Sequence, residues 1–391
     1  MRTASPAPDA DTADRPIHVL HTFANNTEVP YLSWFARRAA QEGNVRYTFL
    51  IMYPERPRMT DEMEALGFKV VHIPFDERHR WTGMLRAIPR LWRHIRHERP
   101  DIVHCNLFDD SVPGLIAARL AGVKARVLTR QDTGFHWMHA RRWVAADRWN
   151  DRLATRIIAI SGENRRFIIE REGAPPHKID LVHNGIPPEL FTRQDPATMA
   201  MLRQRFGVEE HHLVLGTVAR FIQWKGHHHI VGAARRIVDH VPNARFLLCG
   251  RGPQEQEIRA MVRDLGLEGH VVFTGRIEPR DMPSFYGLLD ACLHAAVLEP
   301  FGLVYAEAMM NGAPVVSTPT GAALDAIEDG VNGILVPEAS AEAMAEGVMR
   351  LLNSDRRAIG EAGRTTALRM YPFSVMWNGT MAVYRKALGM P

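Results

Sequence analysis

The chain has 391 residues, of which 46% are hydrophobic and 24% are charged. These values predict a globular protein with two domains, each large enough to bury its own core. The formal net charge of +4 is too small to favour a nucleic-acid binder, and the absence of any stretch of eighteen apolar residues argues against a membrane span.

The N-terminus and the cysteines indicate the cellular compartment of the protein. Residues 1–16 are rich in Ala, Pro, Asp and Thr and lack the apolar segment of a signal peptide, so we expect a disordered tail. Cys105, Cys249 and Cys292 form neither a CxxC pair nor a zinc spacing. They are typical of buried free thiols, which favours a cytoplasmic protein.

The first half alternates short apolar runs with amphipathic helical patterns. Six runs are typical of strands: Ile17–His21, Val45–Ile51, Lys69–Ile73, Asp101–Asn106, Arg126–Thr129 and Arg156–Ile160. Pro30–Gln41 and Val112–Leu120 are expected to be helices between them. Continuous apolar strands alternating with helices predict a parallel sheet covered on both faces.

Polar residues follow two of these strands. The loop from His21 to Glu28 is rich in hydrogen-bonding groups, and within it Asn25 and Asn26 are our candidates for acceptor contacts. The later loop, from Thr129 to His139, supplies Asp132 and His136, which could meet an acceptor hydroxyl. A purely structural turn is the alternative for each loop.

The segment Arg78–Arg99 is strongly basic. Leu85, Ile88, Leu91, Trp92 and Ile95 form an apolar stripe at helical spacing within it. The simplest interpretation is a helix with its stripe in the core and a solvated basic back. The alternative is a patch that faces an anionic lipid or an anionic acceptor.

The second half repeats the strand and helix alternation. Its expected strands are Leu213–Ala219, Arg245–Cys249, Val271–Phe273, Ala291–His294, Pro314–Ser317 and Gly333–Val336. The break between the halves falls near residues 184–205. Two doubly wound domains leave a central cleft at the carboxyl ends of both sheets, where ligands of such sheets bind.

Charged residues follow the strands of the second half. Arg220 and Lys225 share one strand-to-helix loop and are suited to a diphosphate. Glu299 and Glu307 flank the start of a helix expected at Gly302–Asn311, whose free N–H groups favour an anion. A sugar, a diphosphate and a ribose laid end to end would match this order of groups.

Other motifs in this half are weaker. Gly250 and Gly252 lack the third glycine of a dinucleotide fingerprint, which disfavours a nicotinamide dehydrogenase. The turn at Gly275 could hold a flat base through main-chain groups. We expect no metal at His227–His229, because adjacent helical side chains point in different directions. Asp325 is expected to act on the dipole of its own helix.

With these residues in view, the chain from Ile17 to Leu388 resembles the retaining, nucleotide-sugar-dependent glycosyltransferases of family 4. The matching pieces, in order, are Asn184-Gly185-Ile186, Arg220 with Lys225-Gly226, Gly250-Arg-Gly252-Pro253, Phe273-Thr-Gly275, EPFGLVYAEAM from Glu299, Gly312-Ala-Pro-Val-Val, Asp325 and Asn332-Gly333. The resemblance implies the GT-B fold, with an acceptor domain over 17–190, a donor domain over 191–371 and a crossover helix over 372–391.

The resemblance also implies roles for single residues. Arg220 and Lys225 would bind the donor diphosphate, Glu299 the donor sugar and Glu307 the ribose. Backbone of the segment from Phe301 through Gly302 to Leu303 would complete the phosphate clamp. Three further donor-side positions are Gly252, Arg276 and Ile277, the last two near the base. No metal or other cofactor is implied.

The first domain departs from the family pattern. Ala24-Asn25-Asn26 replaces the usual glycine pair, and Gln131 occupies the position of a common histidine, which His136 could replace. Ala295-Ala296 stands where Pro-Ser is usual. The donor side is therefore the better supported half of the predicted site.

The function predicted from the sequence is retaining hexosyl transfer from a nucleotide diphosphate sugar to an acceptor hydroxyl. The setting would be cell-envelope polysaccharide or glycolipid biosynthesis, in the cytoplasm or at the inner membrane face, with Arg78–Arg99 as a peripheral contact. The partners would be the donor and a carbohydrate or lipid-linked acceptor, without nucleic acid. The alternatives are an epimerase or phosphorylase of the same fold, and a non-catalytic partner subunit.

Overall fold

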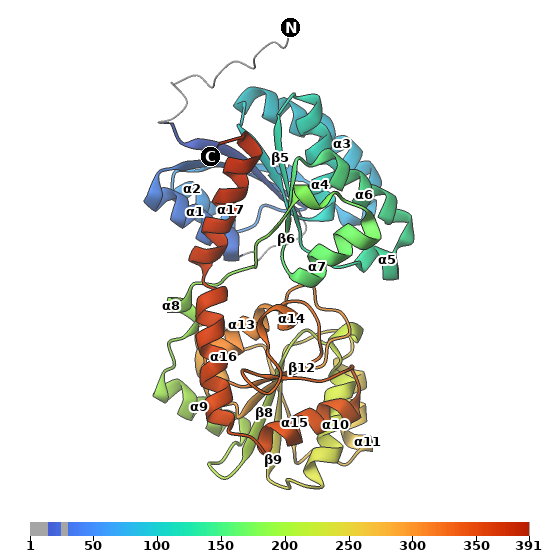
Figure 1. Ribbon diagram of the computed structural model, residues 1–391, viewed down its shortest axis with the longest axis vertical. Helices are drawn as coiled ribbons and strands as arrows, with labels where there is room; N and C mark the ends of the chain where they lie inside the picture. Colours follow the sequence, from blue (N-terminus) through green and yellow to red (C-terminus); the bar gives the residue numbers. More distant parts are fainter. Residues whose placement is uncertain (1–14, 25–29, 391) are drawn as a thin grey trace.

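The computed structural model describes residues 15–24 and 30–390. Asn25, Asn26 and nearly all of the predicted tail lie outside the described residues. Figure 1 shows two α/β bodies stacked along the long axis, with the C-terminal helix running back beside the first body.

The first body is built on a seven-stranded parallel sheet of order β3-β2-β1-β4-β5-β6-β7. Its strands are β1 (Ile17–Ala24), β2 (Val45–Tyr53), β3 (Lys69–Pro74), β4 (Ile102–Cys105), β5 (Ala125–Arg130), β6 (Arg156–Ala159) and β7 (Ile179–Leu181). Its helices are α1 (Pro30–Glu42), α2 (Met59–Ala65), α3 (Arg80–Glu98), α4 (Phe108–Leu120), α5 (Phe135–His139), α6 (Val144–Leu153) and α7 (Gly162–Phe167).

The second body is built on a six-stranded parallel sheet of order β10-β9-β8-β11-β12-β13. Its strands are β8 (Leu213–Val218), β9 (Ala244–Cys249), β10 (Val271–Gly275), β11 (Ala291–His294), β12 (Val315–Ser317) and β13 (Ile334–Leu335). Its helices include α9 (Pro196–Phe206), α10 (His227–Val238), α11 (Glu255–Asp264), α12 (Met282–Gly287), α13 (Leu303–Met310), α14 (Ala323–Ala326), α15 (Ala341–Leu352) and α16 (Arg356–Met370).

Two further helices link the bodies. The short α8 (Pro188–Phe191) lies in the connection after β7, and α17 (Phe373–Leu388) ends the chain. Trp377 and Tyr384 of α17 are buried in the core of the first body, where the Tyr384 hydroxyl bonds His104 at 2.7 Å. The last helix therefore completes the first body after the chain has built the second.

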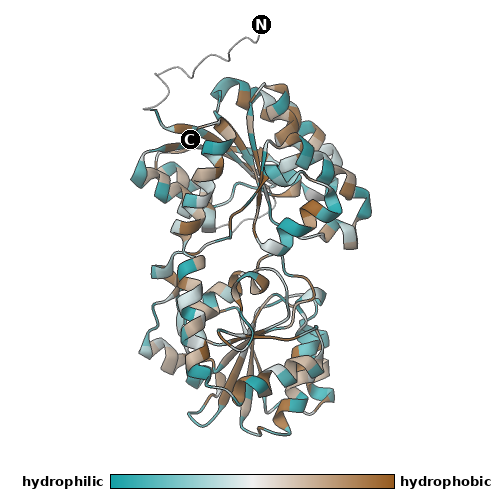
Figure 2. Cartoon of the chain, viewed as in Figure 1, coloured by the Kyte–Doolittle hydropathy of each residue, from teal (hydrophilic) through white to brown (hydrophobic). Residues whose placement is uncertain are grey.

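The predicted class, two doubly wound α/β domains, is confirmed. Both sheets are entirely parallel, and the strands form the apolar centre while polar residues lie on the outer helices (Figure 2). The strand order reverses between β1 and β4 and between β8 and β11. Loops at such reversal points splay apart and leave room for ligands.

Details of several elements differ from the sequence prediction. Of the stripe expected to face the core, Leu91 and Ile95 are buried, together with Met84 and Ala87, which were not predicted. Leu85 and Trp92 are 60% and 40% exposed. The apolar residues of α3 are thus spread over a wider arc than one face can bury. The short strand β7 was not predicted, because Asp180 stands between its two apolar residues and leaves no continuous apolar run.

Cys105, Cys249 and Cys292 are all buried free thiols, as predicted. Within the described part of the chain, no helix combines the length and the apolar content needed to cross a bilayer.

Candidate functional site

The loops after β8 and β11 bring a cation and a carboxylate together. Lys225, at the end of the short 3-10 helix Gln223–Lys225, forms an ion pair with Glu299, 74 residues further along the chain. The Nε2 atom of His294 lies 3.0 Å from the same carboxylate oxygen. Lys225 and His294 thus hold Glu299 at the strand-order reversal of the second sheet.

The electrostatics of this group favour an ionised Glu299. Burial alone would raise the pKa of the carboxyl, which is only 7% exposed. The hydrogen bond from His294 and the charges of His294 and Lys225 outweigh that effect and lower the pKa to about 2. Glu299 is therefore a carboxylate at every physiological pH and can accept hydrogen bonds from sugar hydroxyls.

The helix after Glu299 starts at the same place. Gly302 precedes α13 with a φ of +83°, which only glycine adopts easily. The predicted helix Gly302–Asn311 is therefore shorter at both ends, since α13 runs from Leu303 to Met310. Its first N–H groups have no partner inside the helix, so an anion is favoured beside Lys225.

Close packing of glycines fixes the donor-side loops. A Cβ on Gly226 would lie 1.9 Å from the carbonyl oxygen of Ala295, and one on Gly252 would lie 2.4 Å from that of Phe221. The loops after β8, β9 and β11 therefore touch through their backbones. Arg220 extends from the same region into solvent as an exposed side chain.

Glu307 occupies a different environment from Glu299. It accepts a hydrogen bond of 2.8 Å from the hydroxyl of Tyr286. Desolvation raises the pKa of Glu307 to about 7, although this hydrogen bond opposes the shift. The surroundings thus shift the two pKa values in opposite directions: Glu299 is charged, and Glu307 is close to its titration point at neutral pH.

The remaining donor-side candidates contribute mainly backbone. The side chains of Phe301 and Ile277 are buried in the core of the second body. Leu303 is 37% exposed and Arg276 is exposed. The burial of Phe301 agrees with the backbone contact expected for it, and the buried side chain of Ile277 leaves only its main chain for a ligand.

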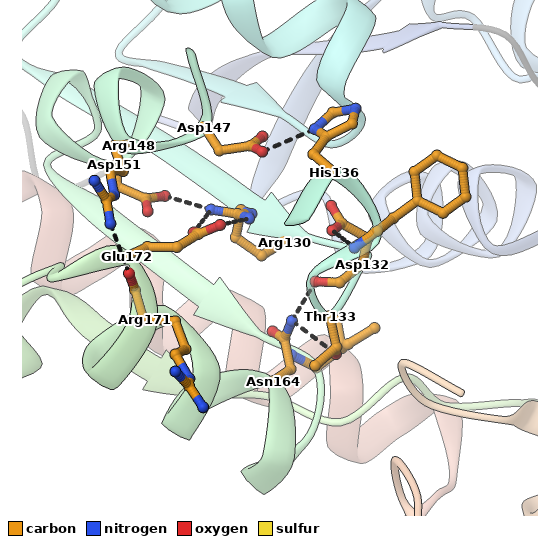
Figure 3. Close-up of polar contacts among 12 residues, drawn as sticks. Arg130, Asp132, Thr133, His136, Asp147, Arg148, Asp151, Asn164, Arg171 and Glu172 are labelled. Atoms are coloured by element: carbon orange, nitrogen blue, oxygen red, sulfur yellow. Dashed lines mark hydrogen bonds and ion pairs between the residues drawn. The ribbon is translucent and has the colours of Figure 1, made fainter. Parts of the chain in front are cut away.

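On the first body, Asp132 and His136 lie at the carboxyl end of β5 (Figure 3). The backbone N–H of Phe135 donates to Asp132 at 3.3 Å, and Asn164 donates to the Asp132 carbonyl. His136 is buried, and its Nδ1 lies 2.8 Å from Asp147. Both candidates are thus held in place by partners from other elements.

A buried ion cluster lies beside Asp132 and His136 and was not predicted from the sequence. The guanidinium of Arg130 contacts Asp151 at 2.9 Å and Glu172 at 2.5 and 3.1 Å. Desolvation raises the pKa of Glu172 to about 7, against the pull of Arg130. An arginine as the last residue of an apolar strand was the one available signal, and its partners lie 21 and 42 residues away.

The two halves of the site touch each other. Phe135 and His139 of α5 pack on Trp224, with ring centroids 5.9 and 5.4 Å apart. Trp224 immediately precedes Lys225, so the segment that carries Asp132 and His136 borders the donor-side loop. The segment that carries the candidate acceptor residues therefore meets the donor-side loop at Trp224, whereas the His136 ring itself lies against Asp147.

A second contact joins α7 to α14, which lie close together in Figure 1. Asp325 was expected to act on its own helix dipole, but its carboxylate accepts from the Gly162 N–H at 2.7 Å and lies 3.0 Å from His183. Glu163 in turn accepts from the N–H of Gly321 at 2.6 Å. These hydrogen bonds connect the start of α7 in the first body to the segment around α14 in the second.

No group of three or more potential metal ligands comes together among residues 15–24 and 30–390. Of the three consecutive histidines, His227 is buried and stacks on Phe221 at 4.0 Å between ring centroids. That the reaction needs no metal or other cofactor stays a prediction.

Comparisons with known proteins give the same assignment in both halves. Residues 17–190 match the model of "Glycosyltransferase Family 4", and residues 200–366 match that of "Glycosyl transferases group 1". A 2-deoxystreptamine glucosyltransferase of Streptomyces kanamyceticus is 27% identical over 90% of this chain and 97% of its own. A GDP-mannose-dependent alpha-(1-6)-phosphatidylinositol monomannoside mannosyltransferase of Mycobacterium tuberculosis is 29% identical over 78% of this chain and 80% of its own.

Solved structures share the fold. HepE from Anabaena, in complex with UDP and glucose, superposes with a TM-score of 0.79 at 21% identity and covers 95% of this chain and 100% of its own. Sucrose-phosphate synthase from Thermosynechococcus elongatus gives a TM-score of 0.80 at 17% identity over 95% and 99%. The chain therefore belongs to the family 4 glycosyltransferases, has the GT-B fold and is a nucleotide-sugar-dependent enzyme of that class.

Proposed function

We propose that the chain transfers a hexosyl group from a nucleotide diphosphate sugar to an acceptor hydroxyl, with retention of the anomeric configuration. The observation that carries this proposal is the group of Lys225, Glu299 and His294 beside the start of α13. A cation, an ionised carboxylate and a helix N-terminus side by side suit a diphosphate that is linked to a sugar.

The donor would lie along the second body. Lys225 and Arg220 neutralise the diphosphate together with the N–H groups at Phe301, Gly302 and Leu303. Glu299 accepts from sugar hydroxyls, and Glu307 accepts from the ribose. The backbone around Gly252 lets the phosphates approach closely, and the main chain at Arg276 and Ile277 holds the base.

In the reaction, the bond between the anomeric carbon and the diphosphate oxygen breaks, and a bond to the acceptor oxygen forms on the same face. The leaving diphosphate keeps the bonding electrons, and Lys225 and Arg220 stabilise its charge without a metal. The acceptor hydroxyl passes its proton to an oxygen of the leaving diphosphate. Asp132 and His136, which belong to the segment that meets the donor loop at Trp224, orient that hydroxyl.

The relatives indicate which compounds to test. The mycobacterial relative uses GDP-mannose and a phosphatidylinositol monomannoside, and HepE was solved with UDP and glucose. UDP-glucose and GDP-mannose are therefore the first donors to try. A lipid-linked or polysaccharide acceptor fits the predicted role in envelope synthesis.

Helix α3 provides a surface for such an acceptor at a membrane. Trp81, Leu85 and Trp92 are exposed, and the guanidinium of Arg96 lies 5.9 Å from the ring centroid of Trp92. Exposed aromatic and aliphatic side chains among arginines suit an anionic bilayer surface. We propose that α3 makes a peripheral contact with the inner membrane face.

The test is transfer by the purified chain, followed by proton NMR of the anomeric signal of the product. We expect an axial sugar in the donor to stay axial in the product. Lys225→Ala and Glu307→Ala should each lower turnover or donor affinity sharply. Unchanged rates and affinities in both variants would contradict the proposal.

The same purified protein also distinguishes a transferase from an epimerase. An epimerase would convert the donor into its epimer when no acceptor is present, whereas a transferase leaves the sugar configuration of the donor unchanged. The alternative of a non-catalytic subunit is not kept, because the chain belongs to an enzyme family.

A further inference from the structure

A small cavity lies next to Asp132 on the first body. It has a volume of about 70 Å³ and is bounded by the ends of β4 and β5 and by α4 and α6. Its walls include Asn106, Ser111, Arg130, Asp132, Asp147 and Asn150. A cavity volume of about 10–15 Å³ is enough for one water molecule, so this cavity has room for a functional group of the acceptor.

The cavity carries an excess of negative charge. Arg130 is the cation in its wall, and two carboxylates, Asp151 and Glu172, already contact its guanidinium. Even with a proton on Glu172, Arg130 is neutralised by Asp151. Asp132 then remains as a further carboxylate in the wall, while Asp147, whose pKa burial raises, lies against His136 (Figure 3).

Polar atoms in the wall lack partners. The Ser111 hydroxyl and the Asn150 side-chain oxygen are buried without a hydrogen-bond partner among the described residues, and these side chains are 1% and 3% exposed. Such atoms reduce stability unless a ligand or water satisfies them. A third buried oxygen of this kind, Oδ2 of Asp151, adjoins the cluster.

The chemistry of the missing ligand follows from these groups. An alkylammonium brings three N–H donors, one positive charge and no acceptor, which complements carboxylate and amide oxygens. A hydroxyl group brings one donor and no charge, so it leaves the negative excess in place. We propose that this cavity binds a primary ammonium group of the acceptor, which makes the acceptor an amine-bearing carbohydrate or cyclitol.

The position of the cavity fits an acceptor subsite. Gln131 and Asn106 line both this cavity and a neighbouring smaller one that reaches Asn184. The α5 helix beyond Asp132 contacts Trp224, next to Lys225. An acceptor anchored here by its amine would present a neighbouring hydroxyl toward the donor sugar; this inference rests on the proposed transferase function.

The test compares two probes that differ in charge at the amine. Binding of 2-deoxystreptamine and of its di-N-acetyl derivative to the full chain is measured by calorimetry. We expect the free amine to bind at least tenfold more tightly than the acetylated form, with an affinity that falls as salt rises. Equal affinities for both probes, or no binding of the free amine, would overturn the assignment.

Two variants make the test specific to the cavity. Asn150→Leu removes an unpartnered oxygen, so we expect an unchanged or higher Tm together with an affinity for the amine lowered at least fivefold. Ser111→Ala should act in the same direction. The control Asp239→Asn removes an exposed carboxylate elsewhere and should leave binding unchanged. Amine affinity unchanged in both cavity variants would also refute the inference.

A variant of the other body separates this inference from the proposed function. Lys225→Met should abolish UDP and GDP binding and leave 2-deoxystreptamine binding intact. If the wild type binds the amine but no nucleotide, the transferase proposal fails and the cavity assignment stands. If the wild type transfers sugar equally well to amine-bearing and amine-free acceptors, the transferase proposal stands and the cavity assignment fails.

Discussion

Replacing Glu299 by glutamine removes the charge of a buried carboxylate while nearly keeping its size. The pKa of Glu299 is about 2 in the folded chain, against an ordinary value of 4.5. This difference corresponds to about 3 kcal/mol of stability. Because the folded pKa is the lower one, that stability is fully present above pH 4.5 and is lost as the pH falls toward 2.

The assay is urea unfolding of wild type and Glu299→Gln at several pH values. We expect the variant to be less stable by about 3 kcal/mol at pH 7 and by only roughly 1 kcal/mol at pH 3. Glu342→Gln is the matched control, because its exposed pair with Arg236 should contribute less than about 1 kcal/mol. A difference that is absent at pH 7, or that stays constant down to pH 3, would refute the reasoning.

Three more perturbations test other contacts. Burial raises the pKa of Glu307 from 4.5 to about 7 in the folded chain, so the stability that its proton contributes is complete below pH 4.5 and is lost as the pH rises to 7. Glu307→Gln should therefore raise the Tm at pH 8 with little effect at pH 5, and equal Tm changes at both pH values would contradict this. Gly226→Ala should lower the Tm and nucleotide affinity more than Gly266→Ala, because both have positive φ but only the first meets a carbonyl oxygen, that of Ala295. Asp325→Asn should increase the radius of gyration in X-ray scattering by loosening the contact between the bodies, and an unchanged radius would show that this carboxylate does not hold them.

The architecture was largely predictable because its signal is local. Strands buried on both faces are continuous apolar runs, so β11 was placed to the residue and most others within three residues. The loops that follow such strands are where α/β sheets bind ligands. Arg220, Lys225 and Glu299 could be named from that rule and the motif order alone.

The contacts inside the site could not be predicted, because they join distant parts of the chain. His294 was read as the end of a strand, and its bond to Glu299 depends on how the following loop folds back. The pairing of Arg130 with Glu172 spans 42 residues and leaves no periodic pattern. Asp325 was assigned to its own helix because the facing Gly162 belongs to the other body.

The prediction of which α3 residues are buried was partly wrong for a related reason. Leu85 and Trp92 have the spacing of a buried stripe, yet the helix turns Met84 and Ala87 inward instead. A hydrophobic pattern predicts that a helix has an apolar face. Which residues of that face are buried depends on the elements that pack against the helix.

The central claim is that Lys225 and Glu299 form a donor diphosphate site in the second body. Calorimetric titration of UDP, GDP and their sugars into wild type and Lys225→Met tests it most directly. The account predicts binding of at least one nucleotide to the wild type and an affinity at least tenfold weaker in the variant. Equal affinity in the two proteins, or no binding of any nucleotide to the wild type, would contradict it.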